Sequence, residues 1–248
     1  MNTRIILRGL SRESGHWGAF IAQFQAALPQ ANVIAVDLPG NGHLHLLRSP
    51  LQVPNMAAHC RAQLAQRGIT TPYHLLTMSL GGMVGVSWAH THPQEVASLV
   101  LINTSMRPFS PWQQRLRPAN YGTLLKLIAG NTDADTWERE ILRMTSNVRD
   151  ASALPHWLHL RAKHPVSRTN VLRQLVAAAR FRAPLAAPAA PTLVLASERD
   201  QLVNVACSKA LAARWRVPLQ VHPTAGHDLT LDDGVWVAAQ VRDWLKSI

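Results

Sequence analysis

Short apolar runs alternate with segments of helical periodicity along most of this chain. Runs with the character of β-strands occupy residues 5–7, 33–36, 73–78, 99–102, 192–195 and 219–222. Apolar residues recur at the spacing of one helix face in residues 17–28, 54–67, 82–92, 203–214 and 231–246. Short apolar strands that alternate with amphipathic helices are typical of a parallel sheet covered by helices on both faces. We therefore predict the α/β fold class with a mostly parallel central sheet.

The alternation stops after Asn103. Between residues 106 and 184 the sequence shows helical patterns and no convincing strand, and the Pro- and Ala-rich residues 184–191 then lead into the next strand run. A chain of 248 residues is long enough for one α/β domain with an insertion, but too short for two full domains with linkers. We predict a core of residues 1–105 and 185–248 with a helical insertion of residues 106–184. Extra helices on the flank of the sheet are the alternative.

Ser79 lies between a predicted strand and a predicted helix, and Gly81 and Gly82 follow it closely. A serine at such a junction sits on a tight turn, and Gly81 removes a side chain that would clash there. The N-terminus of the helix supplies N–H groups and the positive end of a dipole. This setting suits a nucleophile whose substrate acquires negative charge. The usual pattern is G-x-S-x-G, and Thr77 replaces its first glycine, so the turn has to accommodate a β-branched residue.

A nucleophilic serine needs a base and an acid that orients the base. Asp200 follows the strand run 192–195, and His227 follows the last strand run. The chain order Ser, Asp, His and the position of all three beyond strand ends fit a site at the carboxyl edge of an α/β sheet. Asp37, which follows the second strand run, is an alternative acid. Asp228 is expected to be a surface or loop-bracing residue.

Taken together, these motifs resemble the α/β-hydrolase fold serine hydrolases from near residue 1 to the C-terminus. The matching segments are 7–10, Trp17, 36–42, 79–82, 99–103, 200–203 and 225–227. The resemblance implies a catalytic triad of Ser79, Asp200 and His227, and an oxyanion hole formed by the backbone N–H groups of Leu10 and Leu80. It also implies that residues 106–184 form a cap over the active site, and that no cofactor is required. The family usually has His-Gly at the first turn, whereas this chain has Arg8-Gly9; we expect Arg8 to pair with an acidic neighbour, or else to reach a substrate carboxylate.

The resemblance favours a carboxylesterase that acts through an acyl-enzyme intermediate. A serine nucleophile disfavours the dehalogenase and epoxide hydrolase branches, which use aspartate. The compact size, the helical cap and the cap arginines also resemble the methyl esterases that release pimeloyl carrier protein for biotin synthesis. A thioesterase, a carbon–carbon bond hydrolase and a cofactor-free perhydrolase could share the triad. A non-catalytic ligand receptor is the alternative from another class.

Positive charge is concentrated in the predicted cap. Residues 106–190 carry +8 of the formal net charge of +11. Such a field attracts anionic partners, so an acidic carrier protein, an anionic acyl chain and an anionic lipid surface compete with a merely solvated basic surface. We name Arg139, Arg143 and Trp17 as candidate substrate-binding residues, and Arg149 and Arg161 as further candidates. Nucleic acid is disfavoured because no basic stripe interleaved with aromatic residues is present.

The sequence also bears on location and on metal binding. No apolar run approaches the ~18 residues of a membrane span, and the N-terminus is predicted to be a strand and not a signal peptide. Cys60 and Cys207 are predicted to be free thiols, which favours a cytoplasmic location. No cysteine pair, H-E-x-x-H motif or carboxylate cluster predicts a metal site.

Overall fold

The computed structural model describes residues 2–148 and 152–248. Six parallel strands form one sheet in the order β2-β1-β3-β4-β5-β6. The strands are β1 (Asn2–Leu7), β2 (Ala31–Val36), β3 (Tyr73–Met78), β4 (Val96–Ile102), β5 (Thr192–Ser197) and β6 (Leu219–His222). The predicted fold class and all six predicted strand runs are therefore confirmed.

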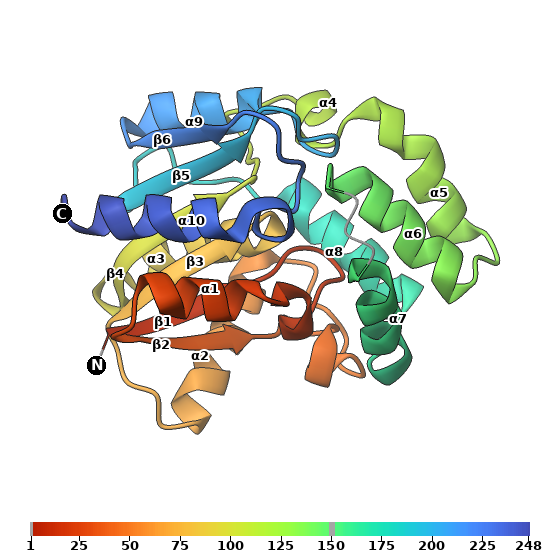
Figure 1. The fold of residues 1–248 in the computed structure, drawn as a ribbon, viewed down its shortest axis with the longest axis horizontal. Coiled ribbons are helices and arrows are strands. Elements are labelled where there is room, and N and C mark those ends of the chain that lie inside the picture. The colour runs from red at the N-terminus through yellow and green to blue at the C-terminus, as the bar shows by residue number, and fades with distance from the viewer. Residues whose placement is uncertain (1, 149–151) are drawn as a thin grey trace.

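Helices cover both faces of the sheet. Successive residues of a strand point to opposite faces, so Ile5 and Leu7 join one buried cluster while Ile6 joins another. The first cluster packs against α2 (Val53–Gln66), α3 (Leu80–Thr91) and α9 (Ala206–Trp215), and the second against α1 (Phe20–Ala27) and α10 (Leu229–Leu245). Figure 1 shows α1 and α10 in front of the sheet. Burial on both faces explains why the strands read as continuous apolar runs.

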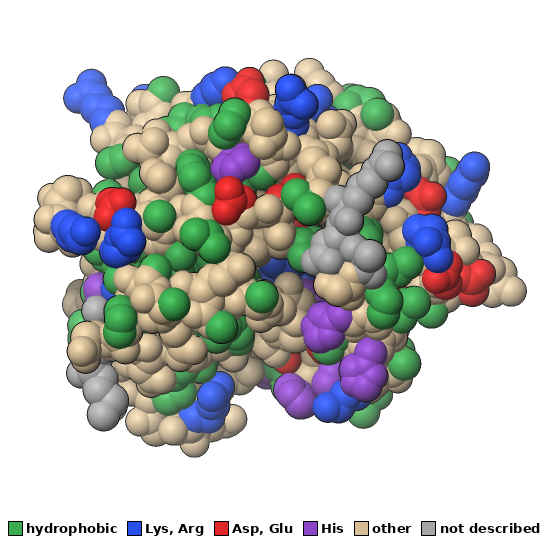
Figure 2. Space-filling view, viewed as in Figure 1, with side chains coloured by type: hydrophobic (Ala, Val, Ile, Leu, Met, Phe, Trp, Pro, Cys, Tyr) green, Lys and Arg blue, Asp and Glu red, His purple; other side chains and the backbone are tan. Residues whose placement is uncertain are grey.

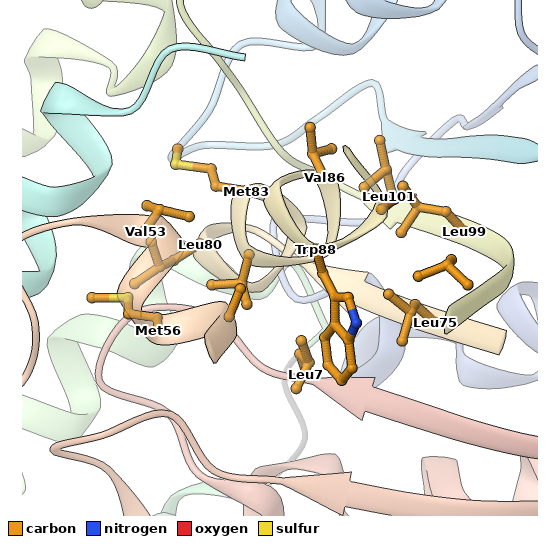
Figure 3. Packing of buried hydrophobic residues seen from close by; sticks show 14 of the residues in the cluster. Leu7, Val53, Met56, Leu75, Leu80, Met83, Val86, Trp88, Leu99 and Leu101 are labelled. Atoms are coloured by element: carbon orange, nitrogen blue, oxygen red, sulfur yellow. The ribbon is translucent and has the colours of Figure 1, made fainter. Parts of the chain in front are cut away.

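Helix α3 lies at the centre of the first cluster. All of its residues from Leu80 to Ala89 are buried, and Trp88 has no exposed surface. Figure 3 shows the Trp88 ring reaching from α3 towards Leu7 of β1. Complete burial of a large apolar side chain contributes about 1.5–3 kcal/mol. The helix that follows Ser79 is therefore anchored firmly to the sheet.

In the described part of the chain, five α-helices lie between β4 and β5: α4 (Trp112–Arg115), α5 (Tyr121–Ala129), α6 (Ala134–Thr145), α7 (Ala153–Lys163) and α8 (Arg168–Arg180). Figure 1 shows them gathered beyond the carboxyl ends of the strands. Leu127, Trp137, Met144 and Val171 form a small buried cluster of their own among these helices. The helical pattern predicted for residues 106–184 is thus present, and the described residues of this stretch add only an isolated bridge between Arg107 and Arg182.

An ion network ties these helices to the core. Glu138 of α6 is buried and accepts from Arg12, in the loop after β1, at 2.6 Å and from Arg161 of α7 at 3.1 Å. The two guanidinium groups also lie over aromatic rings, Arg12 over Trp157 at 4.0 Å and Arg161 over Trp137 at 4.6 Å. Cation–π contacts and buried ion pairs depend on close geometry, so the network fixes where α6 and α7 sit relative to the loop after β1.

Candidate active site

Ser79 occupies a strained turn between β3 and α3. Its backbone angles are φ 55° and ψ −118°, a region that residues with a side chain seldom adopt. Hydrogen bonds hold the turn: the Ser79 N–H donates to the Ile102 carbonyl at 2.9 Å, and the Thr104 hydroxyl donates to the Ser79 carbonyl at 2.8 Å. Strain that the surroundings maintain in this way is a feature of functional sites.

Two glycines allow the loop after β1 to pack against this turn. A Cβ atom at Gly81 would lie 2.6 Å from the carbonyl oxygens of Leu7 and Arg8. A Cβ atom at Gly9 would lie 2.9 Å from the Ser79 Cβ. Only glycine fits where the loop after β1 and the Ser79 turn come this close to each other. The segment that contains Leu10 is therefore held against the Ser79 turn.

Thr77, which replaces the usual glycine, is accommodated by another glycine. Thr77 has no exposed surface, and its hydroxyl donates to the Val100 carbonyl at 2.9 Å. A Cβ atom at Gly85, one turn into α3, would lie 2.9 Å from the Thr77 methyl group. In the family pattern a glycine at position 77 leaves room at this turn. In this chain position 77 is a threonine, and Gly85 leaves the room instead.

His227 and Asp200 meet beyond the ends of β5 and β6. The His227 Nδ1 lies 2.7 Å from the Asp200 Oδ2, and both side chains are almost completely buried. The other oxygen, Oδ1, accepts from the N–H groups of Leu202 at 2.7 Å and Val203 at 2.8 Å. A carboxylate fixed by two backbone donors can hold the Nδ1–H tautomer of the histidine, which leaves the Nε2 lone pair free to accept a proton.

Asn103 braces the histidine loop, a role that the sequence analysis did not assign. Asn103 has a positive φ of 44°, and its amide donates to the His227 carbonyl at 2.8 Å and to the Ser197 hydroxyl at 3.0 Å. Its Oδ1 accepts from the Ser197 N–H at 2.9 Å. The signal in the sequence was a polar residue directly after the apolar run of β4.

Arg8 and Asp228 form a buried ion pair at 2.5 Å that joins the loop after β1 to the loop that carries His227. Arg8 also donates to the Thr230 hydroxyl at 3.1 Å and lies 4.9 Å from the centre of the Trp17 ring. Asp228 caps the N-terminus of α10 by accepting from the Leu231 N–H. The pairing predicted for Arg8 and the bracing role predicted for Asp228 are present, whereas the alternative surface position of Asp228 is wrong, because its side chain is only 3 % exposed.

Asp37 braces a different loop. Its carboxylate accepts from the N–H groups of Ser14 at 2.6 Å and His43 at 3.2 Å. Both donors to Asp37 lie in the loops after β1 and β2. The hydrogen-bonded partner of His227 is Asp200.

A cavity of about 390 Å³ opens between the strand ends and the helices α4, α5, α6 and α8. Ser79, Leu80 and His227 line it together with Leu10. The rest of the wall is mainly apolar and comes from both parts of the chain: Met78, Met83, Trp112, Leu116, Tyr121, Leu124, Ile141, Met144, Leu175, Ala178, Ala179, Leu202 and Val203. Concave apolar sites with a few convergent polar groups are typical of small-molecule binding sites.

The model of a family described as "Alpha/beta hydrolase family" matches residues 5–240. The chain belongs to this family. The hydrolase is 30% identical to a pimeloyl-[acyl-carrier protein] methyl ester esterase of Xanthomonas campestris over 220 residues, which cover 80% of this chain and 78% of that protein. It is 29% identical over 237 residues to a putative carbamate hydrolase RutD of Klebsiella pneumoniae, with 92% and 85% of the two chains covered.

Among solved structures, the hydrolase resembles a putative non-heme bromoperoxidase BpoC from Mycobacterium tuberculosis. The TM-score is 0.79 at 20% identity, and the match covers all of this chain and 92% of the other. At this identity the likeness shows a shared fold. The family and the fold class predicted from the sequence are confirmed.

The candidate substrate-binding residues of the hydrolase lie away from this cavity. Arg139 and Arg143 are exposed on α6 and pair with Asp135 and Glu140, both at 2.9 Å. Trp17 is buried among the residues that pack under α1 and α10. None of these three is among the residues that line the cavity, and their role in substrate binding stays a prediction. Arg149, another candidate, lies outside the described residues.

Other features of the hydrolase bear on the remaining predictions. Cys60 and Cys207 are both free and buried, and burial raises the pKa of Cys60 to about 12. Within residues 2–148 and 152–248, no three His, Cys, Asp or Glu side chains are grouped as metal ligands. None of the helices in the described part of the chain has the length and apolar character that crossing a membrane requires. The cytoplasmic location stays a prediction.

Proposed function

We propose that this hydrolase cleaves carboxylic esters, with Ser79 as nucleophile, His227 as general base and Asp200 as the acid that orients it. One observation carries the proposal: Ser79, on its strained turn, and His227, hydrogen-bonded to Asp200 at 2.7 Å, line the same cavity. The relatives named above as esterase and carbamate hydrolase support the choice of an acyl compound as substrate.

In the proposed mechanism, His227 Nε2 takes the Ser79 proton as the hydroxyl oxygen attacks the ester carbonyl carbon. The tetrahedral oxyanion accepts hydrogen bonds from the backbone N–H groups of Leu80 and Leu10. Leu80 is the first residue of α3, where N–H groups have no acceptor within the helix. Each such donor contributes about 3 kcal/mol to the transition state. The imidazolium, stabilised by Asp200, then protonates the leaving alcohol, and water activated by His227 releases the acid from the acyl-enzyme.

Helices α4 to α8 form the proposed cap of this site. The cavity takes part of its wall from β-strand ends and part from these helices, so a bound substrate would be enclosed between the two. The apolar wall suits an aliphatic or aromatic group on the acyl or the alcohol side of the ester. Exclusion of water by such a wall strengthens the hydrogen bonds to the oxyanion.

A fluorophosphonate probe tests the nucleophile. The probe should add one adduct that mass spectrometry maps to the peptide of Ser79, and Ser79→Ala should abolish both the adduct and the turnover of p-nitrophenyl esters. Labelling that persists in Ser79→Ala would contradict the assignment. A folded wild-type protein that neither reacts with the probe nor hydrolyses any ester or thioester of a broad panel would point to a ligand receptor.

A second candidate is hydrolysis of a methyl ester or thioester on an acyl chain that a carrier protein holds. The relative from Xanthomonas campestris, whose name states such an activity, favours it. The charge distribution also favours it, because residues 152–190 contain six Lys and Arg side chains and no Asp or Glu. Helix α6 contributes little to this field: with its flanking Asp133 it carries four acidic residues against Arg139 and Arg143. The positive surface for an acidic carrier would therefore lie on α7, α8 and the segment after α8.

A further inference from the structure

Among the described residues, three arginines line the cavity: Arg8, Arg12 and Arg115. Two of them are neutralised by buried carboxylates, Arg8 by Asp228 and Arg12 by Glu138. Among the residues that the structure describes, no carboxylate forms an ion pair with Arg115. The largely apolar wall thus includes a positive charge without a counter-ion.

The surroundings of Arg115 leave this charge uncompensated. Its Nε is buried and has no hydrogen-bond partner. The neighbouring titratable groups that affect its pKa are Cys207 and Arg107. Burial raises the pKa of the Cys207 thiol, which is therefore neutral near pH 7, and Arg107 repels Arg115. Burial also lowers the pKa of Arg115, as expected for a cation without a carboxylate beside it.

One contact of Arg115 is structural. Its Nη2 donates to the Ala178 carbonyl at 2.6 Å, and this carbonyl lies in the last turn of α8, where the helix leaves acceptors unsatisfied. A guanidinium has five N–H donors in a planar fork, so capping α8 uses only one of them. A neutral side chain could have capped α8 without placing an unpaired charge in a largely apolar cavity, which is energetically costly.

We propose that Arg115 binds a carboxylate on the substrate, and that this hydrolase is selective for esters whose cavity-bound part carries that negative charge. The proposal rests on the proposed ester hydrolysis and adds the substrate class. A carboxylate fits the fork of a guanidinium in a bidentate manner. A single unpaired guanidinium also matches one negative charge better than the two charges of a phosphate.

Matched substrates separate this role from helix capping. The test measures kcat/KM for methyl esters of straight-chain acids that end in a carboxylate, and for the same esters with a terminal carboxamide, over a series of chain lengths. Wild type, Arg115→Met, Arg115→Lys and the control Arg180→Met are compared. Arg180 is exposed near the end of α8 and does not line the cavity, so its replacement removes the same charge from the same neighbourhood.

At the best chain length, wild type and Arg180→Met should prefer the carboxylate ester by about ten- to a hundredfold, the range expected for a hydrogen bond between charged groups. Arg115→Met should lose this preference, mainly through KM, because its kcat/KM should fall much more on the carboxylate ester than on the carboxamide ester. Arg115→Lys should retain part of the preference, because it keeps the charge but not the planar fork.

Two results would overturn the inference: equal kcat/KM of wild type on both esters at every chain length, or equal losses on both esters in Arg115→Met. Either would leave Arg115 as a cap of α8. If Arg115→Met does not fold, the wild-type ratio and Arg115→Lys decide the question. Failure of the proposed function looks different, because wild type would then hydrolyse neither ester, or Ser79→Ala would hydrolyse both.

Discussion

At the scale of single residues, Asp200 and Asp37 have different surroundings although each follows a strand. Asp200 contacts His227 and two backbone N–H groups, whereas Asp37 contacts two backbone N–H groups of neighbouring loops. Sequence position alone left both as candidate acids, because both lie beyond the carboxyl ends of strands. The choice depends on which strand end faces the histidine loop, and that is a property of the assembled sheet.

This difference predicts separate effects of two conservative variants. Asp200→Asn should lower kcat by about 10⁴-fold with little change in the unfolding midpoint, the loss that a wrongly oriented histidine causes in other serine triads. Asp37→Asn should keep kcat within about an order of magnitude and lower the unfolding midpoint, since a weaker acceptor remains for its two backbone donors. Steady-state kinetics and thermal unfolding on both variants measure the two effects. Near-normal turnover in Asp200→Asn with a large loss in Asp37→Asn would reverse the assignment.

The buried pair of Arg8 and Asp228 makes a prediction about pH. Burial alone would raise the pKa of Asp228, but the Arg8 charge and hydrogen bonds from Arg8 and Thr230 hold it below its ordinary value. A lowered pKa in the folded state stabilises the fold above the unfolded pKa of about 4, and this stability is lost as the pH falls through the folded pKa.

Arg8→Met should therefore lower the free energy of unfolding by about 3–5 kcal/mol at pH 7, because it leaves a buried carboxylate without its partner. The difference from wild type should shrink below about pH 4. Replacing both partners, as in Arg8→Met with Asp228→Asn, should restore part of the loss. Denaturant titrations across this pH range measure it, and a difference that stays constant down to acid pH would contradict the account.

At the scale of secondary-structure elements, the sequence predicted much of what the structure shows. Apolar runs located every strand of the sheet because buried parallel strands have a pattern distinct from the amphipathic helices between them. The sequence did not predict where α6 ends. Trp137, Ile141 and Met144 pack in the small buried cluster among the helices between β4 and β5, but Val148, at the same spacing, lies after the helix and is 47% exposed. Helix ends depend on local hydrogen bonds that periodicity does not encode.

The residues of the candidate site also divide into those that the sequence indicates and those that only the structure shows. Ser79, Asp200 and His227 follow strand ends and could be picked out, and the structure brings Asp200 and His227 into contact. Arg115 and Asn103 could not be assigned, because their roles depend on which segments meet across the cavity. Arg139 and Arg143 were chosen for their spacing on one helix face, but spacing does not reveal that each has an acidic partner within its own helix.

The packing of α3 on β3 predicts a coupled pair of substitutions. Gly85→Ala should lower the free energy of unfolding by about 1–3 kcal/mol, because the new methyl group would meet the Thr77 methyl at 2.9 Å. Thr77→Ala removes that methyl, although it also loses the hydrogen bond to Val100, about 1 kcal/mol. The double variant should be more stable than the sum of the single losses predicts. A double-mutant cycle by denaturant unfolding measures this coupling, and strictly additive losses would show that Gly85 does not accommodate Thr77.

At the scale of the whole molecule, residues 106–190 carry +8 of the formal net charge of +11, but their Lys and Arg side chains do not form one continuous patch on the face that Figure 2 shows. On that face Lys and Arg side chains are dispersed, several of them beside Asp or Glu. Charges arranged in this way act on a partner mainly through their summed field, which salt screens over ~10 Å at 0.1 M and ~3 Å at 1 M.

If an acidic carrier protein delivers the substrate, kcat/KM for a carrier-linked ester should fall as salt rises, whereas a short neutral ester should barely respond. Lys163→Glu with Arg182→Glu, both exposed within residues 152–190, which contain no Asp or Glu, should reproduce the loss at low salt. Arg139→Glu with Arg143→Glu serves as the comparison and should have less effect, because those arginines already face acidic partners. Equal salt responses for the two substrates would leave a basic surface without a carrier-binding role.

The parts of the candidate site lie far apart along the chain: Leu10 follows the first strand, Ser79 the third, Asp200 the fifth and His227 the sixth. The site therefore exists only when strands of high sequence separation have paired, and such pairing is intrinsically slow. During refolding from denaturant, helical signal should return well before turnover does. A ribosome would have to release the chain up to His227, and with it all six of these strands, before a nascent copy could assemble the candidate site.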